Sequence, residues 1–474
     1  MTGSDQPSST ARRRRIVLLV LALLGTALVL ALAFDIARKK REATPAPLPA
    51  LELVGEVDDP EAWGHSFPRQ LADYLGTVDQ ERTRFGGSDA LPRTPTPADP
   101  RSIVTQSKLA DDPRLLRVWA GYAFAIDHRE ERGHAYMLED QTFTARHQKP
   151  QPGACLQCHA SIVTANRTLG RGAPDPDAAG AAKLNAMPYA EARTHVDRAI
   201  GCIDCHDPAT LRLRISRPAF IEAIARLEAS RGRPGYDVNA MATRAQMRSY
   251  VCAQCHTEYA LEGEEARLVQ PWEAGLRADE ILARYDATGF RDWVHAETGA
   301  PMLKAQHPEF ELWSEGLHAR AEVSCVDCHM PYRRVGATKI TDHHVRSPLL
   351  DAARACQVCH PIGADELVAR AEAIQERTLA MQDTAMDRLI ELIEALRNAH
   401  AADPADPRLE AARMAQRRAS FLLDFVSSEN SAGFHAPQEA ARLLFLALDQ
   451  ILAGNRALAS RDSGTAGPAA SSTR

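Results

Sequence analysis

The chain has 474 residues, with 62 acidic and 56 basic side chains and a formal net charge of −6 at pH 7. This small negative charge argues against a nucleic-acid partner, and no basic tract outside the N-terminal region suggests one.

The N-terminal region contains one apolar segment. Arg12 to Arg15 precede the uncharged run from Ile16 to Phe34, and Arg38 to Arg41 follow it. A helix over these nineteen residues would be roughly 28 Å long, close to the bilayer core. A cleavable signal has a shorter apolar region, of about 7 to 15 residues, although Ala31 to Ala33 would suit a cleavage site. We expect a cytoplasmic stub and a retained membrane anchor over residues 1–43, rather than a signal, and then a Pro/Ala linker from Glu42 to Glu52.

All ten cysteines fall into five C-x-x-C-H pentapeptides. Two thiols three residues apart, followed at once by an imidazole, form the attachment motif of c-type haem. A set of zinc knuckles also uses C-x-x-C but does not explain why a histidine follows the second cysteine every time. The sequence therefore predicts five covalently bound haem c groups. Their residues are Cys155, Cys158, His159, Cys202, Cys205, His206, Cys252, Cys255, His256, Cys325, Cys328, His329, Cys356, Cys359 and His360.

The haem motifs fix the compartment, because haem c is attached outside the cytoplasm. The N-terminus is expected inside and the rest of the chain outside the cytoplasm, anchored to the membrane by the N-terminal helix. Basic residues flank the apolar run on both sides in equal number, so the charge difference across the run does not predict which end lies in the cytoplasm. Only 5% of residues are aromatic, which fits an interior filled largely by porphyrin. The irregular motif spacing argues against a repeat array, and we expect a pentahaem region over residues 44–361, with helices such as Arg217 to Gly232.

The character of the chain changes after the last motif. Three long helices are predicted, from Asp365 to His400, from about Arg408 to Val426 and from about Ala436 to Ala459. The fold class expected is mainly α: a multihaem cytochrome c with a haem-packed N-terminal region and long C-terminal helices forming a dimer interface. Residues 362–460 would form the dimerisation region, and residues 461–474 a disordered tail. The apolar stripe of the first helix is Leu367, Ala371, Ile374, Met381, Ala385, Leu389, Leu392 and Leu396.

The number of iron ligands decides between electron transfer and catalysis. A haem with two axial protein ligands transfers electrons, whereas one with a free position can bind a substrate. The motifs supply one ligand per haem, and sequence alone does not assign the others among the remaining histidines. These are His65, His128, His134, His147, His195, His295, His307, His318, His343, His344, His400 and His435.

Several long stretches resemble the pentahaem cytochrome c nitrite reductase family, periplasmic enzymes that reduce nitrite to ammonium. The resemblance extends from about Gly121 to about Ala459. It is carried by "GYAFAIDHREERGHAY" from Gly121, "CAQCHTEYA" from Cys252, "TGAPMLKAQHPEFELWSEGLHARAEVSCVDCHMP" from Thr298, "TDHH" from Thr341 and "GFHAP" from Gly433.

This resemblance implies the second ligands of four haems and leaves the fifth open. The haem on Cys155 and Cys158 has no distal partner and would be the catalytic one. The implied pairs are His134 with His256, His343 with His206, His435 with His329, and His318 with His360.

The family places an arginine, a tyrosine and a histidine around the open iron. The matching residues are Arg146, Tyr259 and His307. Most of the family binds the catalytic haem through lysine in C-x-x-C-K, whereas this chain has CLQCH, so His159 would be the proximal ligand. The resemblance is therefore to a subgroup with histidine at this position.

The family also places a calcium ion beside the active site. Glu258, the carbonyl oxygens of Tyr259 and Lys304, and the side-chain oxygen of Gln306 would bind it here. Oxygen donors are what Ca²⁺ prefers. The ion would fix the loop so that His307 and Tyr259 point at the iron.

The resemblance implies nitrite as substrate, a homodimer, and an electron donor that is either a quinol-oxidising membrane multihaem cytochrome or a soluble multihaem protein. Two alternatives stay open. One is a pentahaem electron carrier with all five irons closed and no substrate. The other is a related multihaem enzyme that reduces hydroxylamine or sulfite.

Overall fold

The computed structural model describes residues 9–43, 57–130, 132–336 and 338–460. Residues 1–8 of the expected stub and anchor, most of the Pro/Ala linker and the expected disordered tail over residues 461–474 lie outside these ranges. The chain divides into two units, one formed by residues 1–51 and 332–342 and the other by residues 52–331 and 343–474.

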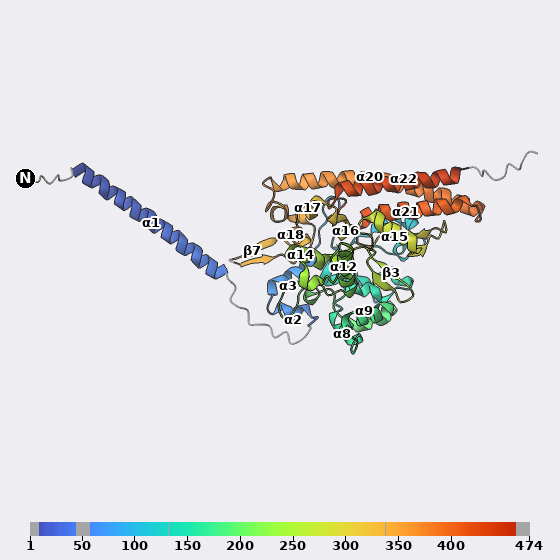
Figure 1. Cartoon of the computed structure of the whole chain (residues 1–474), viewed down its shortest axis with the longest axis horizontal. Coiled ribbons are helices and arrows are strands. Elements are labelled where there is room, and N and C mark those ends of the chain that lie inside the picture. Colours follow the sequence, from blue (N-terminus) through green and yellow to red (C-terminus); the bar gives the residue numbers. More distant parts are fainter. Residues whose placement is uncertain (1–8, 44–56, 131, 337, 461–474) are drawn as a thin grey trace, which may run out of the picture. The chain divides into compact units, whose positions relative to one another are not determined.

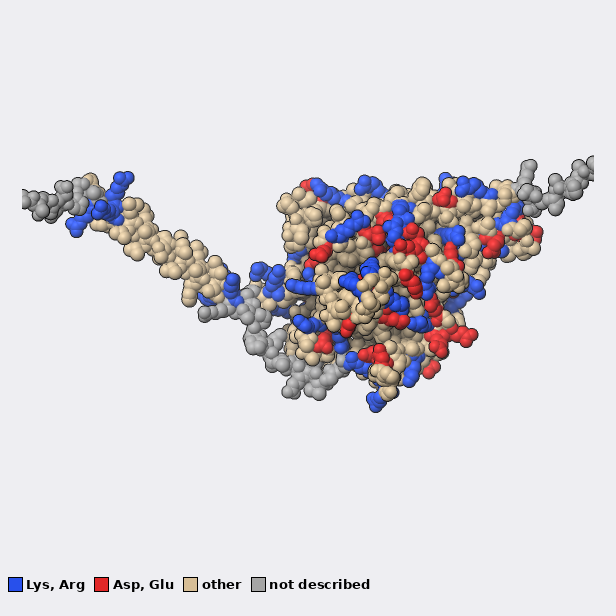
Figure 2. All heavy atoms as spheres, viewed as in Figure 1, with Lys and Arg blue, Asp and Glu red and all other residues tan. Residues whose placement is uncertain are grey.

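The first unit contains the apolar N-terminal helix and one hairpin. Helix α1 (Ser9–Ala43) is long and apolar enough over Arg12–Lys40 to cross a membrane, and a stretch of 18 residues within it has a mean hydropathy of 3.0. Figure 2 shows its uncharged middle between basic groups at both ends. Strands β7 (Tyr332–Val335) and β8 (Thr338–Thr341) pair antiparallel, with Tyr332 opposite Thr341. The predicted apolar N-terminal helix is thus present.

In the second unit, each haem motif lies in or directly after a helix. The first motif includes α7 (Leu156–His159), the second α11 (Cys202–Cys205) and the fourth α18 (Cys325–His329). The third begins in the last turn of α14 (Arg244–Ala253), and the fifth follows α19 (Ala352–Ala355). A helical turn places the two cysteines three residues apart on one face, as attachment to a single porphyrin requires.

Longer helices and small hairpins surround these motifs. The helix predicted at Arg217 to Gly232 is confirmed as α12 (Pro218–Ser230), whose first residue is proline, as suits a helix N-terminus. Other helices are α9 (Pro176–Ala186), α15 (Ala278–Thr288) and α16 (Glu309–Ser314). The two-stranded sheets of this unit pair β1 (Leu91–Pro92) with β2 (Ile103–Val104), β3 (Ala260–Glu262) with β4 (Arg267–Val269), and β5 (Trp293–Val294) with β6 (Pro301–Met302).

The three predicted C-terminal helices are confirmed as α20 (Ala364–Ala402), α21 (Arg408–Ser428) and α22 (Pro437–Ala459). They lie side by side in Figure 1 and are packed together. Gly454 of α22 permits this close packing, because a Cβ there would lie 3.0 Å from the Leu392 side chain. The expected mainly helical fold with packed C-terminal helices is therefore correct.

The apolar stripe of α20 is buried in its C-terminal half but not throughout. Leu389, Leu392 and Leu396 are fully buried, together with Met386 and Ile393. Leu367, Ile374 and Met381 are not in the core, and Met381 is 37% exposed. The stripe is thus buried within this chain mainly over the second part of the helix, whereas Leu367, Ile374 and Met381 in the first part keep partly exposed side chains.

Candidate active site

Four pairs of histidines face one another in the second unit. Each pair combines a motif histidine with one from a distant segment, and the separations of the ring centres are nearly equal. They are 6.4 Å for His134 and His256, 6.5 Å for His206 and His343, 6.3 Å for His318 and His360, and 6.3 Å for His329 and His435.

These separations fit a metal ion between two imidazoles. Two metal–nitrogen bonds of about 2.0 Å, with half a ring behind each nitrogen, place the ring centres roughly 6 Å apart. Direct stacking or a hydrogen bond between the rings would bring the centres closer. The four pairs that the family resemblance implies are thus brought together at a spacing that suits haem iron.

His159 of the first motif differs from the other four motif histidines. It has no ring contact with a second imidazole in the part of the chain that the structure describes. Burial lowers the pKa of His159 to about 3, and the nearby Arg146 and His307 act in the same direction. The imidazole is therefore neutral, as a metal ligand must be, and two of the predicted catalytic residues lie close to it.

Tyr259, the third predicted catalytic residue, also lies beside the first motif. Burial raises the pKa of its hydroxyl well above the ordinary value, and the neighbouring Cys158 and Cys155 add to this effect. The phenol therefore stays protonated at neutral pH and can donate a hydrogen bond. Arg146, Tyr259 and His307 come from three separate segments and converge on one motif.

Arg146 is fixed by two contacts. Its Nη2 donates to Oε1 of Gln141 at 2.8 Å, and its guanidinium carbon lies 4.7 Å above the ring of Phe124. Its Nε atom is buried and has no protein partner. A partly buried guanidinium with an unused donor is suited to binding an anion.

The four predicted calcium ligands lie next to one another. Glu258 is fully buried, and its Oε2 accepts from the backbone N–H of Gln306 at 2.6 Å. The side-chain amide of Gln306 lies 3.3 Å from the carbonyl oxygen of Lys304, and Tyr259 directly follows Glu258. Glu258 therefore contacts the segment that carries Lys304 and Gln306, and the oxygen donors of these two segments would suit a hard cation.

The surroundings of Glu258 also favour a cation. Burial raises its pKa well above the ordinary value, and the nearby Glu311 and Asp292 contribute. Burial likewise raises the pKa of Glu311 to about 8 and that of Asp292 to about 7. Carboxyl groups gathered in a buried region are costly when ionised, and a divalent ion would offset that cost.

The side chain of Lys304 links the loop that carries Gln306 and His307 to helix α21. It is 2% exposed, and its Nζ lies 3.0 Å from Oδ2 of Asp424 and 2.8 Å from Oγ of Ser428, both on α21. The backbone carbonyl is thereby left to face Gln306. The long C-terminal helices thus hold the loop that carries His307.

Neighbouring motifs touch through their cysteines. Cys158 of the first motif contacts Cys255 of the third, and Cys252 of the third contacts Cys325 of the fourth. Cys205 of the second motif also lies near Cys255, and Cys328 of the fourth lies near the fifth. The third motif is therefore the junction of the series.

The sequence profile of the cytochrome c552 family matches residues 59–470, most of the chain. The chain belongs to this family. Cytochrome c-552 of Bacteroides fragilis is 33% identical over 416 residues, which cover 86% of this chain and 78% of that protein. Cytochrome c-552 of Parabacteroides distasonis is 35% identical over 416 residues, with the same coverage.

A solved structure with a similar fold is the catalytic subunit of cytochrome c nitrite reductase from Desulfovibrio desulfuricans. Its TM-score is 0.72 at 28% identity, covering 86% of this chain and 87% of that one, and that subunit has two calcium sites. This multihaem cytochrome c552 therefore has the mainly helical fold of that reductase.

Two groups that the sequence analysis did not single out lie at this site. The hydroxyl of Tyr122 hydrogen-bonds to the side chain of Gln306 and lies near Arg146. Glu309 lies between His256 and His307. The position of Glu309, two residues after His307, could have indicated a carboxylate at this site. Tyr122 is 184 residues from Gln306 in the 474-residue chain, and no local pattern predicts their contact.

Proposed function

We propose that this cytochrome c552 is an ammonia-forming nitrite reductase that binds five covalent haem c groups and Ca²⁺. Four haems would have two histidine ligands each, and the haem on Cys155 and Cys158 would be bound by His159 alone, as in a subgroup with histidine at this position. The observation that carries the proposal is that Arg146 and His307 lie near His159 while Tyr259 lies near the two cysteines of the same motif.

The haem at the first motif would supply electrons and one free iron position for nitrite. Arg146 would attract the anion and polarise its N–O bonds through the unused Nε–H. His307 would pass protons to the departing oxygens, because a histidine exchanges protons readily near neutral pH. The neutral hydroxyl of Tyr259 would donate a hydrogen bond to the bound nitrogen species.

Glu258, Gln306 and the carbonyl oxygens of Tyr259 and Lys304 would hold the calcium ion. The ion would neutralise the buried carboxylate of Glu258 and fix both segments that carry catalytic side chains. Bound calcium would therefore affect the position of His307 rather than react with nitrite. Removal of calcium by a chelator should lower nitrite turnover while leaving the haem content unchanged.

The domain layout proposed is a membrane anchor over residues 1–43, a periplasmic catalytic region over 44–361 and a dimerisation region over 362–460. Exposed apolar side chains on the C-terminal helices support a homodimer. Phe445 and Leu452 are 70% and 58% exposed and lie seven residues apart on one face of α22. The electron donor would be a quinol-oxidising membrane multihaem cytochrome or a soluble multihaem protein, and α1 favours the former.

The test is nitrite-dependent oxidation of a reduced viologen by the purified holoprotein, with ammonium measured as product. One ammonium per six electrons would support the proposal. His307→Asn should lower kcat by about 10²–10⁴-fold, the usual contribution of a general acid. His195→Asn, which changes an exposed histidine, is the matched control. Inertness towards nitrite would favour the electron carrier, and turnover of only hydroxylamine or sulfite would favour the related enzymes.

A further inference from the structure

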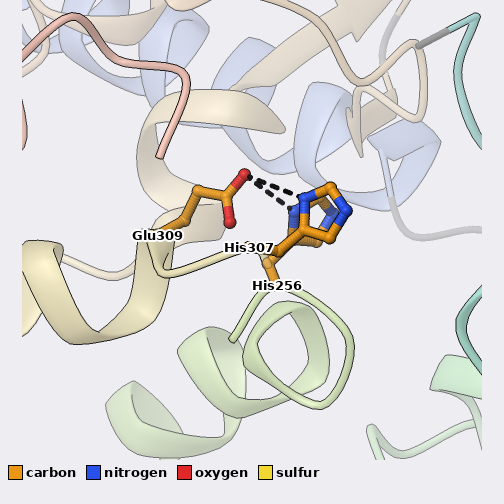
Figure 3. Close-up of side chains that lie close together, drawn as sticks. All are labelled: His256, His307 and Glu309. Atoms are coloured by element: carbon orange, nitrogen blue, oxygen red, sulfur yellow. Dashed lines mark ion pairs between the residues drawn. The ribbon is translucent and has the colours of Figure 1, made fainter. Parts of the chain in front are cut away.

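Glu309, the first residue of α16, faces two imidazoles at once. Its Oε1 lies 3.5 Å from Nδ1 of His256 and 3.7 Å from Nδ1 of His307. Figure 3 shows the two rings close together on one side of this carboxylate. The ring centres are 6.1 Å apart, with the planes at 76°. One carboxylate therefore lies behind both a motif histidine and a candidate catalytic histidine.

The atoms involved leave the opposite nitrogen of each ring free for another role. His256 turns Nδ1 to Glu309, so that its Nε2 is available on the side where His134 lies. Nδ1 of His307 is buried and has no partner within hydrogen-bond distance. Oε2 of Glu309 is also buried and also lacks such a partner. His307 would thus direct Nε2 away from Glu309.

Glu309 also accepts a hydrogen bond from Asn430. Nδ2 of Asn430 donates to Oε1 of Glu309 at 3.0 Å, and Nζ of Lys108 donates to Oδ1 of Asn430 at 3.1 Å. Asn430 adopts a left-handed backbone conformation with φ of 58°, which asparagine tolerates better than most residues. The carboxylate is therefore oriented by a group outside the two imidazoles.

A separate metal ion bound by His256, His307 and Glu309 is an alternative, since their ligand atoms lie within 4.8 Å of one another. The Asn430 amide already donates to Oε1, the oxygen that faces both rings, and a cation at that point would face this N–H. Hydrogen bonds from both imidazoles to Glu309 would require only that the distances of 3.5 and 3.7 Å between Oε1 and the two Nδ1 atoms become shorter. Hydrogen bonds at catalytic sites are commonly long before ligands bind. The contacts favour hydrogen bonds.

We propose that Glu309 is a positioning residue that accepts the Nδ1–H of both His256 and His307. Its charge would strengthen His256 as an iron ligand and favour the oxidised haem at the third motif, which lowers that haem's reduction potential. Its second contact would orient His307 towards the first motif. The part that concerns His307 rests on the proposed function, and the part that concerns His256 does not.

Other ligand histidines provide an internal comparison. Nδ1 of His206 faces the carbonyl oxygen of Leu211 at 3.0 Å, and Nδ1 of His329 faces that of Arg346 at 3.2 Å. Nδ1 of His435 instead faces a carboxylate, Oε2 of Glu429, at 3.0 Å. A carboxylate therefore faces Nδ1 of one proposed ligand of the third haem, His256, and of one proposed ligand of the fourth, His435. Nδ1 of His206, a proposed ligand of the second haem, faces a neutral carbonyl oxygen instead.

The test is Glu309→Gln in the holoprotein, with haem content measured first and the haem potentials then measured by redox titration followed by EPR. We expect the potential of the haem held by His134 and His256 to rise, and kcat/KM for nitrite to fall roughly tenfold, in the range typical of lost partners of metal ligands. Glu429→Gln should instead raise the potential of the haem held by His329 and His435. An unchanged potential at the third haem in Glu309→Gln would overturn the proposal.

Glu309→Asp separates charge from position and serves if the Gln variant does not assemble. It keeps the negative charge on a shorter side chain, so the third-haem potential should stay closer to wild type while kcat/KM falls. Equal shifts in the Asp and Gln variants would mean that the carboxylate charge is not the cause, and would overturn the haem part. A potential shift in a protein that never reduces nitrite would uphold that part and reject the proposed function.

Discussion

The haem-motif region and the C-terminal helices bury their residues in different ways. Leu389, Leu392, Phe421 and Leu443 are fully buried by the chain's own side chains in α20, α21 and α22. The polypeptide leaves the motif cysteines partly exposed, apart from Cys359, which is exposed. The side chain of His256 is 46% exposed. The C-terminal helices are thus buried by protein side chains, which include Tyr285 of α15 against Phe421. The motif region instead has surface that the proposed porphyrins would cover.

The strongest test of this difference is to remove one attachment site. Cys252→Ala with Cys255→Ala would take away the haem at the junction, whose cysteines contact those of the first and fourth motifs. We expect no stable holoprotein, because the remaining apolar surface cannot offset the conformational entropy of the region. The measurement is haem content and resistance to limited proteolysis.

The same experiment has a built-in control. The fifth motif lies at the edge, with Cys359 exposed, so Cys356→Ala with Cys359→Ala should be better tolerated. If both double variants accumulate equally and resist protease, the motif region folds without its cofactors and the comparison fails.

A buried ion pair links two motifs and should give the next largest effect. Arg217 donates from Nη1 to Oδ1 of Asp204 at 2.6 Å, and from Nε and Nη2 to the carbonyl oxygens of Gln157 and Ala160. Arg217→Met leaves Asp204 buried without its cation, which typically costs about 3–5 kcal/mol. Thermal unfolding of the holoprotein measures the loss.

A second substitution identifies the cause of that loss. Adding Asp204→Asn to Arg217→Met removes the unpaired charge and should restore part of the stability. Absence of any recovery would show that the lost hydrogen bonds to the first motif, rather than the unpaired carboxylate, account for the effect.

The two regions also differ in how far the sequence predicts them. The ends of α20, α21 and α22 follow from local periodicity and prolines, because a helix is a local structure. The five haem motifs can likewise be identified from the sequence, because each is a run of five consecutive residues. The contacts of Glu309 with Asn430 and of Lys304 with Asp424 join segments about 120 residues apart in the sequence, and no local pattern encodes them. The exposure of Met381 likewise depends on where α22 begins to cover α20.

A cavity in the C-terminal helices should have a smaller and purely local effect. Leu392 is fully buried against α22, so Leu392→Ala should cost about 3 kcal/mol. Met381→Ala on the same helix, at a 37% exposed position, should change the stability little in the monomer. The measurement is thermal unfolding, with the haem spectrum as a check. Loss of haem in Leu392→Ala would contradict the separation of the two regions.

The smallest expected effect is the response to acid. Arg101 donates to Asp99 through Nε and Nη2, each at 2.8 Å, and these hydrogen bonds lower the pKa of Asp99 to about 2. A carboxyl group with a lowered folded-state pKa contributes stability above its unfolded pKa of about 4, and this is lost as the pH falls through the folded value. The contribution is on the order of 1 kcal/mol, because the side chain of Asp99 is still 16% exposed and solvent screens part of its interaction with Arg101.

Asp99→Asn should remove this part of the acid dependence between pH 4 and about pH 2. Glu391→Gln on α20 provides the contrast, because both partners of its ion pair with Arg388 are 59% exposed and solvent screens them. Unfolding by acid, followed by circular dichroism, measures both variants. The haem-motif region would then owe part of its acid sensitivity to a partly buried carboxylate, whereas the exposed pairs of the C-terminal helices would contribute almost none. Equal slopes for Asp99→Asn and the wild type would contradict this assignment.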